Sequence, residues 1–185
     1  MRWSAAVLAG GRSSRFGQDK ARFDFAGRPL MGWVLGSLEA ADERFIVSSS
    51  DYPEFGLTTH PDLLPGGDSL SGLHTALSLA RNDWVAVAAC DLPMLSGPYW
   101  EHLLGWASPE VRAVVGVGSS GHMEPLAALY HRSLLSEVEE RLRSDRLKLQ
   151  SLLEAAPVRR LEWAGLEARF GKDLYLNANR LEDLP

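Results

Sequence analysis

The feature that most constrains the fold is an uncharged run, WVAVAAC, which spans residues 84–90 and is followed at once by Asp91. A strand that is apolar at successive positions, rather than at alternate ones, is buried on both faces, as in the centre of a parallel sheet. A similar run at residues 3–9 ends in glycines, as a buried strand does where it opens into a loop. The sequence therefore predicts a sheet that is covered by helices on both sides.

Segments with strand and helix patterns alternate over the first part of the chain. Apolar runs predict further strands at 45–47 and 113–117, and apolar residues at helical spacing predict helices at 29–41, 70–81 and 98–106. Such alternation implies parallel strands joined by crossover helices, and hence a three-layer, Rossmann-like α/β fold with a mostly parallel central sheet. After Gly118 the pattern is looser, with a strand expected at 126–130 and helices at 133–143 and 147–155.

Length and composition agree with one domain, since 185 residues of which 45% are hydrophobic suffice for a core of their own. No repeat or linker divides the sequence, so we expect residues 1–185 to form a single domain. The one cysteine, Cys90, excludes a disulfide framework within the chain and leaves too few thiolates for a structural zinc site. The five histidines lack metalloprotease spacing, so no zinc is expected.

The charge balance narrows the class of partner. A formal net charge of -5 argues against a nucleic-acid surface, because duplex binding needs a basic face. The apolar run near the N-terminus is too short to span a membrane and is followed by glycines and charges, which predicts neither a signal peptide nor an anchor. We therefore expect a cytoplasmic protein that binds small molecules.

The first strand leads into a glycine-rich, basic loop, LAGGRSSRFGQDK, at residues 8–20. Gly10 and Gly11 allow the backbone to approach a ligand, and successive N–H groups in such a loop form an anion-binding concavity. Four basic residues accompany one acidic residue between Gly11 and Arg22, although the chain is acidic overall. The loop matches neither the dinucleotide-binding motif nor the P-loop. It nevertheless predicts a phosphate site, to which Arg15 and Lys20 add charge.

Asp91 follows the central strand, at the edge where open α/β sheets bind their ligands. Mg²⁺ takes one or two protein carboxylates and completes its shell with phosphate oxygens and water. Asp91 is therefore a candidate Mg²⁺ ligand in a nucleotide site. The structural alternative is that it only fixes the turn before Pro93.

These segments resemble a known family. The residues Leu8, Ala9, Gly10, Gly11, Arg15, Gly17 and Lys20 are similar to the signature loop of nucleotidyltransferases that build nucleotide-linked cofactors and sugars. The double glycine is most similar to the molybdenum cofactor guanylyltransferases, the MobA family, whereas the related molybdopterin cytidylyltransferases usually have alanine-glycine there. The resemblance implies a nucleotidyltransferase fold and a nucleotide site formed by Leu8, Ala9, Gly10, Gly11, Lys20, Ser48, Asp62 and Asp91.

Weaker matches and departures accompany this resemblance. Asp62 lies in a histidine-proline-aspartate step that the family shares, whereas Ser48 stands where the family often has asparagine. Residues 124–130 resemble the family's strand near the acceptor. Asn177 and Asn179 resemble its paired asparagines, which implies contact with the metal or the acceptor. Asn179 and Glu182 also have the spacing of a capping box, which is a purely structural alternative.

The family's activity is the function that the resemblance implies. The terminal phosphate of molybdenum-molybdopterin would attack the α-phosphate of GTP, with Arg15, Lys20 and Asp91 as catalytic residues and Mg²⁺ as cofactor. GTP and molybdenum-molybdopterin would be the partners, with transient contact to proteins that deliver the cofactor, and with no nucleic acid or membrane. The alternatives are a molybdopterin cytidylyltransferase, a sugar-phosphate nucleotidyltransferase, or a nucleotide-binding module without turnover.

Overall fold

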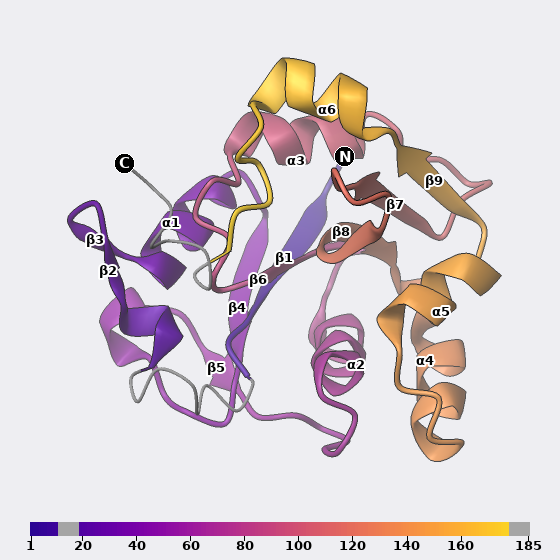
Figure 1. The fold of residues 1–185 in the computed structure, drawn as a ribbon. Coiled ribbons are helices and arrows are strands. Elements are labelled where there is room, and N and C mark those ends of the chain that lie inside the picture. Colours follow the sequence, from indigo (N-terminus) through magenta and orange to yellow (C-terminus); the bar gives the residue numbers. More distant parts are fainter. Residues whose placement is uncertain (11–18, 178–185) are drawn as a thin grey trace.

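The computed structural model describes residues 1–10 and 19–177, and they form three layers (Figure 1). The middle layer is a sheet of seven strands: β1 (Trp3–Leu8), β4 (Glu43–Val47), β5 (Thr59–His60), β6 (Trp84–Ala89), β7 (Ala113–Val117), β8 (Met123–His131) and β9 (Val158–Leu161). Its order is β5-β4-β1-β6-β8-β7-β9. The predicted α/β class and the mostly parallel central sheet are confirmed.

Helices cover both faces of this sheet. On one face pack α1 (Leu30–Ser37), α3 (Gly97–Leu104) and α6 (Trp163–Phe170), and on the other α2 (Ser69–Leu79), α4 (Leu135–Arg143) and α5 (Leu149–Ala155). Every residue of β1 is buried, and successive residues alternate between the two cores: Ala5 and Val7 face α1 and α3, whereas Ala6 and Leu8 face α2. The uncharged run at 84–90 is therefore the middle strand of the sheet, as predicted, and the run at 3–9 is a buried parallel strand beside it.

One strand is reversed. β8 is antiparallel to both of its neighbours, β6 and β7, whereas every other neighbouring pair in the described sheet is parallel. A tight turn joins β7 to β8, in which the Gly118 N–H donates to the His122 carbonyl at 2.8 Å. As a result β8 begins at the sheet edge where β1, β4 and β6 end.

The helix predicted at 29–41 is shorter in the structure, where α1 ends at Ser37. Leu38 is fully buried, but it lies in the turn that follows the helix, with its N–H bonded to the Leu35 carbonyl. Its apolar character therefore reflects burial against the core and not helical structure. Several short elements of the structure are not predicted from the sequence. These are α6, β5, β9, the hairpin β2 (Asp24–Phe25) and β3 (Arg28–Pro29), and the 3₁₀ turns η1 (Lys20–Arg22), η2 (Pro53–Phe55) and η3 (Arg132–Leu134).

Glu137 and Arg141, like Glu139 and Arg143, have the i,i+4 spacing that predicts ion pairs on a solvated helix face. Both pairs are present on α4, at 2.9 Å and 3.3 Å. The expectation that this face is solvated is wrong at Arg141, which is buried and also donates to Ser151 of α5 at 3.2 Å. The pair therefore helps to hold α4 against α5.

Within residues 1–10 and 19–177, no helix has the length and apolarity that a membrane span requires.

Candidate functional site

The carboxyl ends of β4, β1 and β6 lie side by side and carry five of the predicted site residues, Leu8, Ala9, Gly10, Ser48 and Asp91. Leu8 is in register with Val47 on one side and with Ala89 on the other. The ladders continue past the strand ends, because Ala9 N–H donates to the Val47 carbonyl at 2.9 Å and Cys90 N–H donates to the Leu8 carbonyl at 3.1 Å. The start of the glycine-rich loop is thereby fixed between Ser48 and Asp91. This edge of the sheet is the candidate site.

Lys20 and Asp91 meet at this edge. The Lys20 Nζ lies 3.5 Å from Asp91 Oδ2, and the two side chains are only 25% and 20% exposed. A cation and a carboxylate, each a predicted ligand of a nucleotide or its metal ion, are thus partly shielded from water and close together. Partial exclusion of water strengthens their interaction with phosphate charge.

A polar network holds η1, the turn on which Lys20 lies. The Asp19 carboxylate accepts hydrogen bonds from Ala21 N–H at 3.0 Å and from the Tyr52 hydroxyl at 3.1 Å. Arg22 donates to Asp19 at 2.9 Å and to Glu54 at 2.6 Å, and its guanidinium lies over the Tyr52 ring. Burial and the nearby Asp19 raise the pKa of Tyr52 to about 12, so its hydroxyl stays a donor.

This network changes the role of one base in the loop segment. Arg22 counts towards the basic excess in the sequence, but in the structure its charge is offset by Asp19 and Glu54. Arg22 therefore anchors η1 to the segment after β4 and does not add to the charge that a ligand meets. Gly11 and Arg15, two of the other predicted contacts, lie outside the described residues.

Ser48 is buried and binds the protein itself. Its hydroxyl donates to the Ala9 carbonyl at 2.7 Å and accepts from Ser50 N–H at 3.1 Å. It therefore fixes the backbone at the start of the glycine-rich loop. Contact between Ser48 and a nucleotide stays a prediction.

Asp62 lies after β5, at the outer end of the same edge, in an exposed loop that leads to α2. Leu63 N–H donates to Thr75 Oγ1 at 3.0 Å and the Ser71 hydroxyl donates to the Leu64 carbonyl, which hold the loop against α2. Although Asp62 is exposed, partial loss of hydration raises the pKa of its carboxyl above the ordinary value, and His74 opposes the rise.

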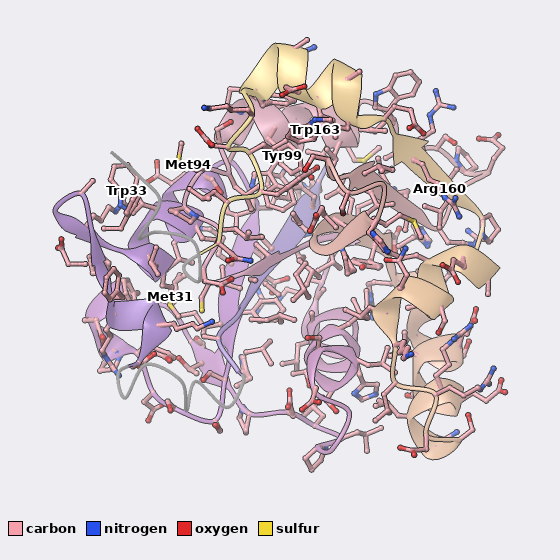
Figure 2. All side chains as sticks on the ribbon, in the orientation of Figure 1. Met31, Trp33, Met94, Tyr99, Arg160 and Trp163 are labelled. Atoms are coloured by element: carbon pink, nitrogen blue, oxygen red, sulfur yellow. The ribbon has the colours of Figure 1, made fainter. Side chains whose placement is uncertain are left out.

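The segment after α6 returns to the candidate site and carries Asn177, the last described residue. Tyr175 anchors it, because its hydroxyl lies 3.1 Å from the Tyr99 hydroxyl, which in turn donates to the Ala127 carbonyl at 2.5 Å. Tyr99 is a buried residue of α3 and lies close to the yellow segment that follows α6 (Figure 2). Asn179 and the capping-box spacing with Glu182 lie outside the described residues.

Tyr175 packs against a glycine of the sheet. A Cβ on Gly116 of β7 would collide with the Tyr175 hydroxyl and would lie 2.8 Å from Leu166 Cδ1. The anchor of the returning segment therefore depends on the absence of a side chain on β7. No role for Tyr99, Tyr175 or Gly116 is predicted from the sequence. They are far apart in the sequence, and only the folded chain brings them together.

The donor set at this edge fits Mg²⁺ better than a metal that needs a protein cage. Across residues 1–10 and 19–177, no three histidine, cysteine, aspartate or glutamate side chains gather in a metal-binding cluster. Asp91 supplies one hard oxygen donor, which suffices for an ion that takes its other ligands from phosphates and water. Burial and the neighbouring Asp91 raise the pKa of the Cys90 thiol to about 12, which favours the protonated thiol over the nucleophilic thiolate.

A concavity lies away from this edge. It has a volume of about 700 Å³ and lies between α3, β9 and α6, where Arg159 packs over the Trp106 ring at 4.0 Å. Arg160 and Trp163 mark that side of the molecule in Figure 2, far from Met31 and Met94. None of the predicted site residues lines it.

The fold and the residue types gathered at this edge are those expected of a nucleotide-binding transferase of the Rossmann-like type. Comparison with known families agrees, since the model of the MobA-like NTP transferase domain matches residues 5–161. The chain therefore belongs to the family of MobA-like NTP transferases.

Individual relatives are similar over nearly the whole chain. A Deinococcus radiodurans protein named "Probable molybdenum cofactor guanylyltransferase" is 37% identical over 182 residues, which cover 98% of this chain and 91% of that protein. A Pyrococcus horikoshii protein of the same name is 32% identical over 200 residues, which cover 100% of this chain and 98% of that protein. Among solved structures, molybdopterin-guanine dinucleotide biosynthesis protein A from Archaeoglobus fulgidus has a TM-score of 0.81 at 25% identity, with 98% and 94% of the two chains covered.

Proposed function

We propose that the protein transfers GMP from GTP to the terminal phosphate of molybdenum-molybdopterin, which gives the guanine dinucleotide form of the cofactor and pyrophosphate. The observation that carries this proposal is the Lys20–Asp91 pair beside the glycine-rich loop, at the carboxyl ends of the central strands. The names of the relatives from Deinococcus and Pyrococcus and of the Archaeoglobus structure support the choice of substrates.

The chemistry needs little from the protein beyond position and charge. An oxygen of the acceptor phosphate forms a bond to the α-phosphorus of GTP, and the bond from that phosphorus to the leaving pyrophosphate breaks. A phosphate monoester has a second pKa of about 6, so the nucleophile is already largely ionised at neutral pH and no protein base is required. Lys20 and Arg15 offset charge on the phosphates and hold the reacting groups in line.

Mg²⁺ is the proposed cofactor, with Asp91 as its ligand from the protein. Bound there, it would neutralise charge on the phosphate oxygens and on the departing pyrophosphate. Leu8, Ala9, Gly10, Gly11, Ser48 and Asp62 are the proposed further contacts of the nucleotide. Asn177 and Asn179 are the proposed contacts of the metal or the acceptor. A reducing compartment such as the cytoplasm fits the single free cysteine, and the acceptor would arrive by transient contact with delivery proteins.

The direct test is an assay of the purified protein with GTP, Mg²⁺ and the molybdenum-loaded acceptor. We expect one pyrophosphate for each guanine dinucleotide formed, and loss of both products when the metal is chelated. Tight GTP binding without any pyrophosphate would instead support a nucleotide-binding module without turnover.

Lys20→Ala is expected to weaken GTP binding or lower turnover by at least about tenfold, because a charge-assisted contact to a phosphate contributes roughly 1.5–3 kcal/mol. Lys148→Ala is the control, since Lys148 is exposed and precedes α5, away from the sheet edge. Calorimetric titration with GTP and steady-state kinetics measure both effects. Equal effects of the two substitutions would place the phosphates elsewhere.

GTP is expected to bind at least about 30-fold more tightly than CTP, ATP or UTP, because two unpaired polar groups in a base pocket cost roughly 1–3 kcal/mol each. Calorimetry with Mg²⁺ present measures the four affinities. A preference for CTP would favour a cytidylyltransferase, a class also represented on this fold by 2-C-methyl-D-erythritol 4-phosphate cytidylyltransferase from Thermus thermophilus, with a TM-score of 0.66. Four equal affinities would contradict the guanylyltransferase proposal.

A further inference from the structure

Glu124 lies at the same edge of the sheet as Asp91, one strand further from the glycine-rich loop. The last pair in the ladder between β6 and β8 is Ala88 with Ala127. Towards the same sheet edge, Asp91 lies three residues after Ala88 and Glu124 lies three residues before Ala127. Because β8 is reversed, Glu124 enters this edge at the start of a strand. It thus flanks the candidate site on the side opposite to β1 and β4.

The carboxyl group of Glu124 is half-buried and supported by packing. Met123 points into the core beneath α2, so Glu124 faces the opposite side of the sheet, on which Tyr99 and Tyr175 lie. A Cβ on Gly118 would lie 2.5 Å from Glu124 Oε1, so the carboxylate occupies space that a side chain there would fill. Burial raises the pKa of Glu124 above its ordinary value, and the exposed His122 opposes the rise.

This carboxylate has acceptor capacity that the described protein does not use. Within residues 1–10 and 19–177, neither a hydrogen bond nor an ion pair reaches the Glu124 carboxylate. Half-buried carboxylates are normally hydrogen-bonded, because loss of hydration is costly unless donors replace the water. A ligand that brings N–H donors to this edge would supply what the fold omits.

The donor pattern that fits is a pair of neighbouring N–H groups. An ionised carboxylate only accepts, and its two oxygens accept best from two parallel donors. A 2-amino-4-oxopyrimidine ring presents such a pair, in its amino group and the adjacent ring N–H. The ring occurs both in guanine and in the pterin of molybdopterin.

The position of Glu124 in the sheet distinguishes between guanine and the pterin as the source of this ring. The proposed nucleotide contacts come from the ends of β1, β4 and β5, on one side of Asp91, whereas Glu124 comes from β8 on the other side. We therefore propose that Glu124 binds the pterin of the acceptor through its amino group and adjacent ring N–H, and so determines acceptor specificity. This inference rests on the proposed function, which supplies a pterin-bearing acceptor.

The test compares two free ring systems on the protein loaded with Mg²⁺ and a non-hydrolysable GTP analogue. Pterin carries the donor pair, whereas lumazine has a carbonyl in place of the amino group. Ligand-observed NMR titrations are expected to show that the wild type binds pterin at least about tenfold more tightly than lumazine, and that Glu124→Gln reduces this ratio to below about threefold. Glu101→Gln, an exposed position on α3, is the matched control and should keep the wild-type ratio.

Two further measurements separate this inference from its rivals. The affinity for GTP should change by less than about twofold in Glu124→Gln, whose side chain keeps the size of glutamate and should preserve the melting temperature. An unchanged pterin preference in Glu124→Gln, or none in the wild type, would overturn the role of Glu124. Loss of the preference for GTP over CTP in Glu124→Gln would assign the side chain to guanine instead. Failure of the proposed function is seen separately, as absence of pyrophosphate release by the wild type.

Discussion

Asp91→Ala is expected to fold and to lose Mg²⁺-dependent turnover by at least about 10²-fold, equivalent to roughly 2.7 kcal/mol of transition-state stabilisation. Asp91 follows the central strand and supplies a hard oxygen donor next to Lys20. Its removal deletes a negative charge beside the predicted phosphate site, so affinity for metal-free GTP should be kept or even increased. Steady-state kinetics over a range of Mg²⁺ concentrations, together with calorimetry of metal-free GTP, measure the two parts of this expectation.

The matched control lies at the other end of the same strand. Asp83 immediately precedes β6 and is exposed, so Asp83→Ala removes the same charge from the opposite edge of the sheet. It should leave turnover within about twofold of the wild type, because exposed charges far from the site are screened. Near-normal turnover of a folded Asp91→Ala protein would contradict the metal role.

Gly116→Ala is expected to destabilise the protein by about 1–3 kcal/mol, because a methyl group forced into a packed core displaces its neighbours. Here the neighbours are the Tyr175 hydroxyl and Leu166. Displacement of Tyr175 would break its contact with Tyr99 and shift the segment that carries Asn177, so turnover should fall as well. Denaturant unfolding measures the first effect and steady-state kinetics the second.

Gly165→Ala is the control for this change, because a Cβ at Gly165 of α6 meets no atom within 4 Å. It should leave stability unchanged or raise it, since alanine is the better helix former by about 1 kcal/mol. The double variant Gly116→Ala with Tyr175→Phe removes the colliding hydroxyl and should recover part of the loss. Strictly additive effects of the two substitutions would mean that the hydroxyl is not the obstacle.

The central strands could be predicted because they are buried on both faces. Such burial requires apolar residues at successive positions, and these can be recognised in the sequence. WVAVAAC at 84–90 contains no charge, and β6 is buried at all but its last residue. β9 has the sequence VRRL, and both arginines are exposed at the edge of the sheet. Such a strand shows neither an apolar run nor alternation, so its existence depends on pairing with β7 and could not be inferred locally.

The candidate site divides in the same way. The glycine-rich loop and Asp91 could be predicted because each consists of characteristic residue types directly after a buried strand. The bond from Ser48 to Ala9 joins residues 39 positions apart, and the contact between Tyr99 and Tyr175 spans 76. Contacts of this kind depend on strand order and on how segments return to the sheet, and a single sequence displays neither.

The reversal of β8 has an evolutionary consequence. Loops that meet the proposed nucleotide leave the ends of β1, β4 and β5, whereas the turn between Gly118 and His122 brings the chain into β8 on the opposite flank. Insertions or exchanges in that hairpin would therefore alter one flank of the reaction centre without shifting the other. Under the proposed function, a lineage with this strand order could exchange one substrate while it retains the second, and the two flanks could be changed one at a time by design.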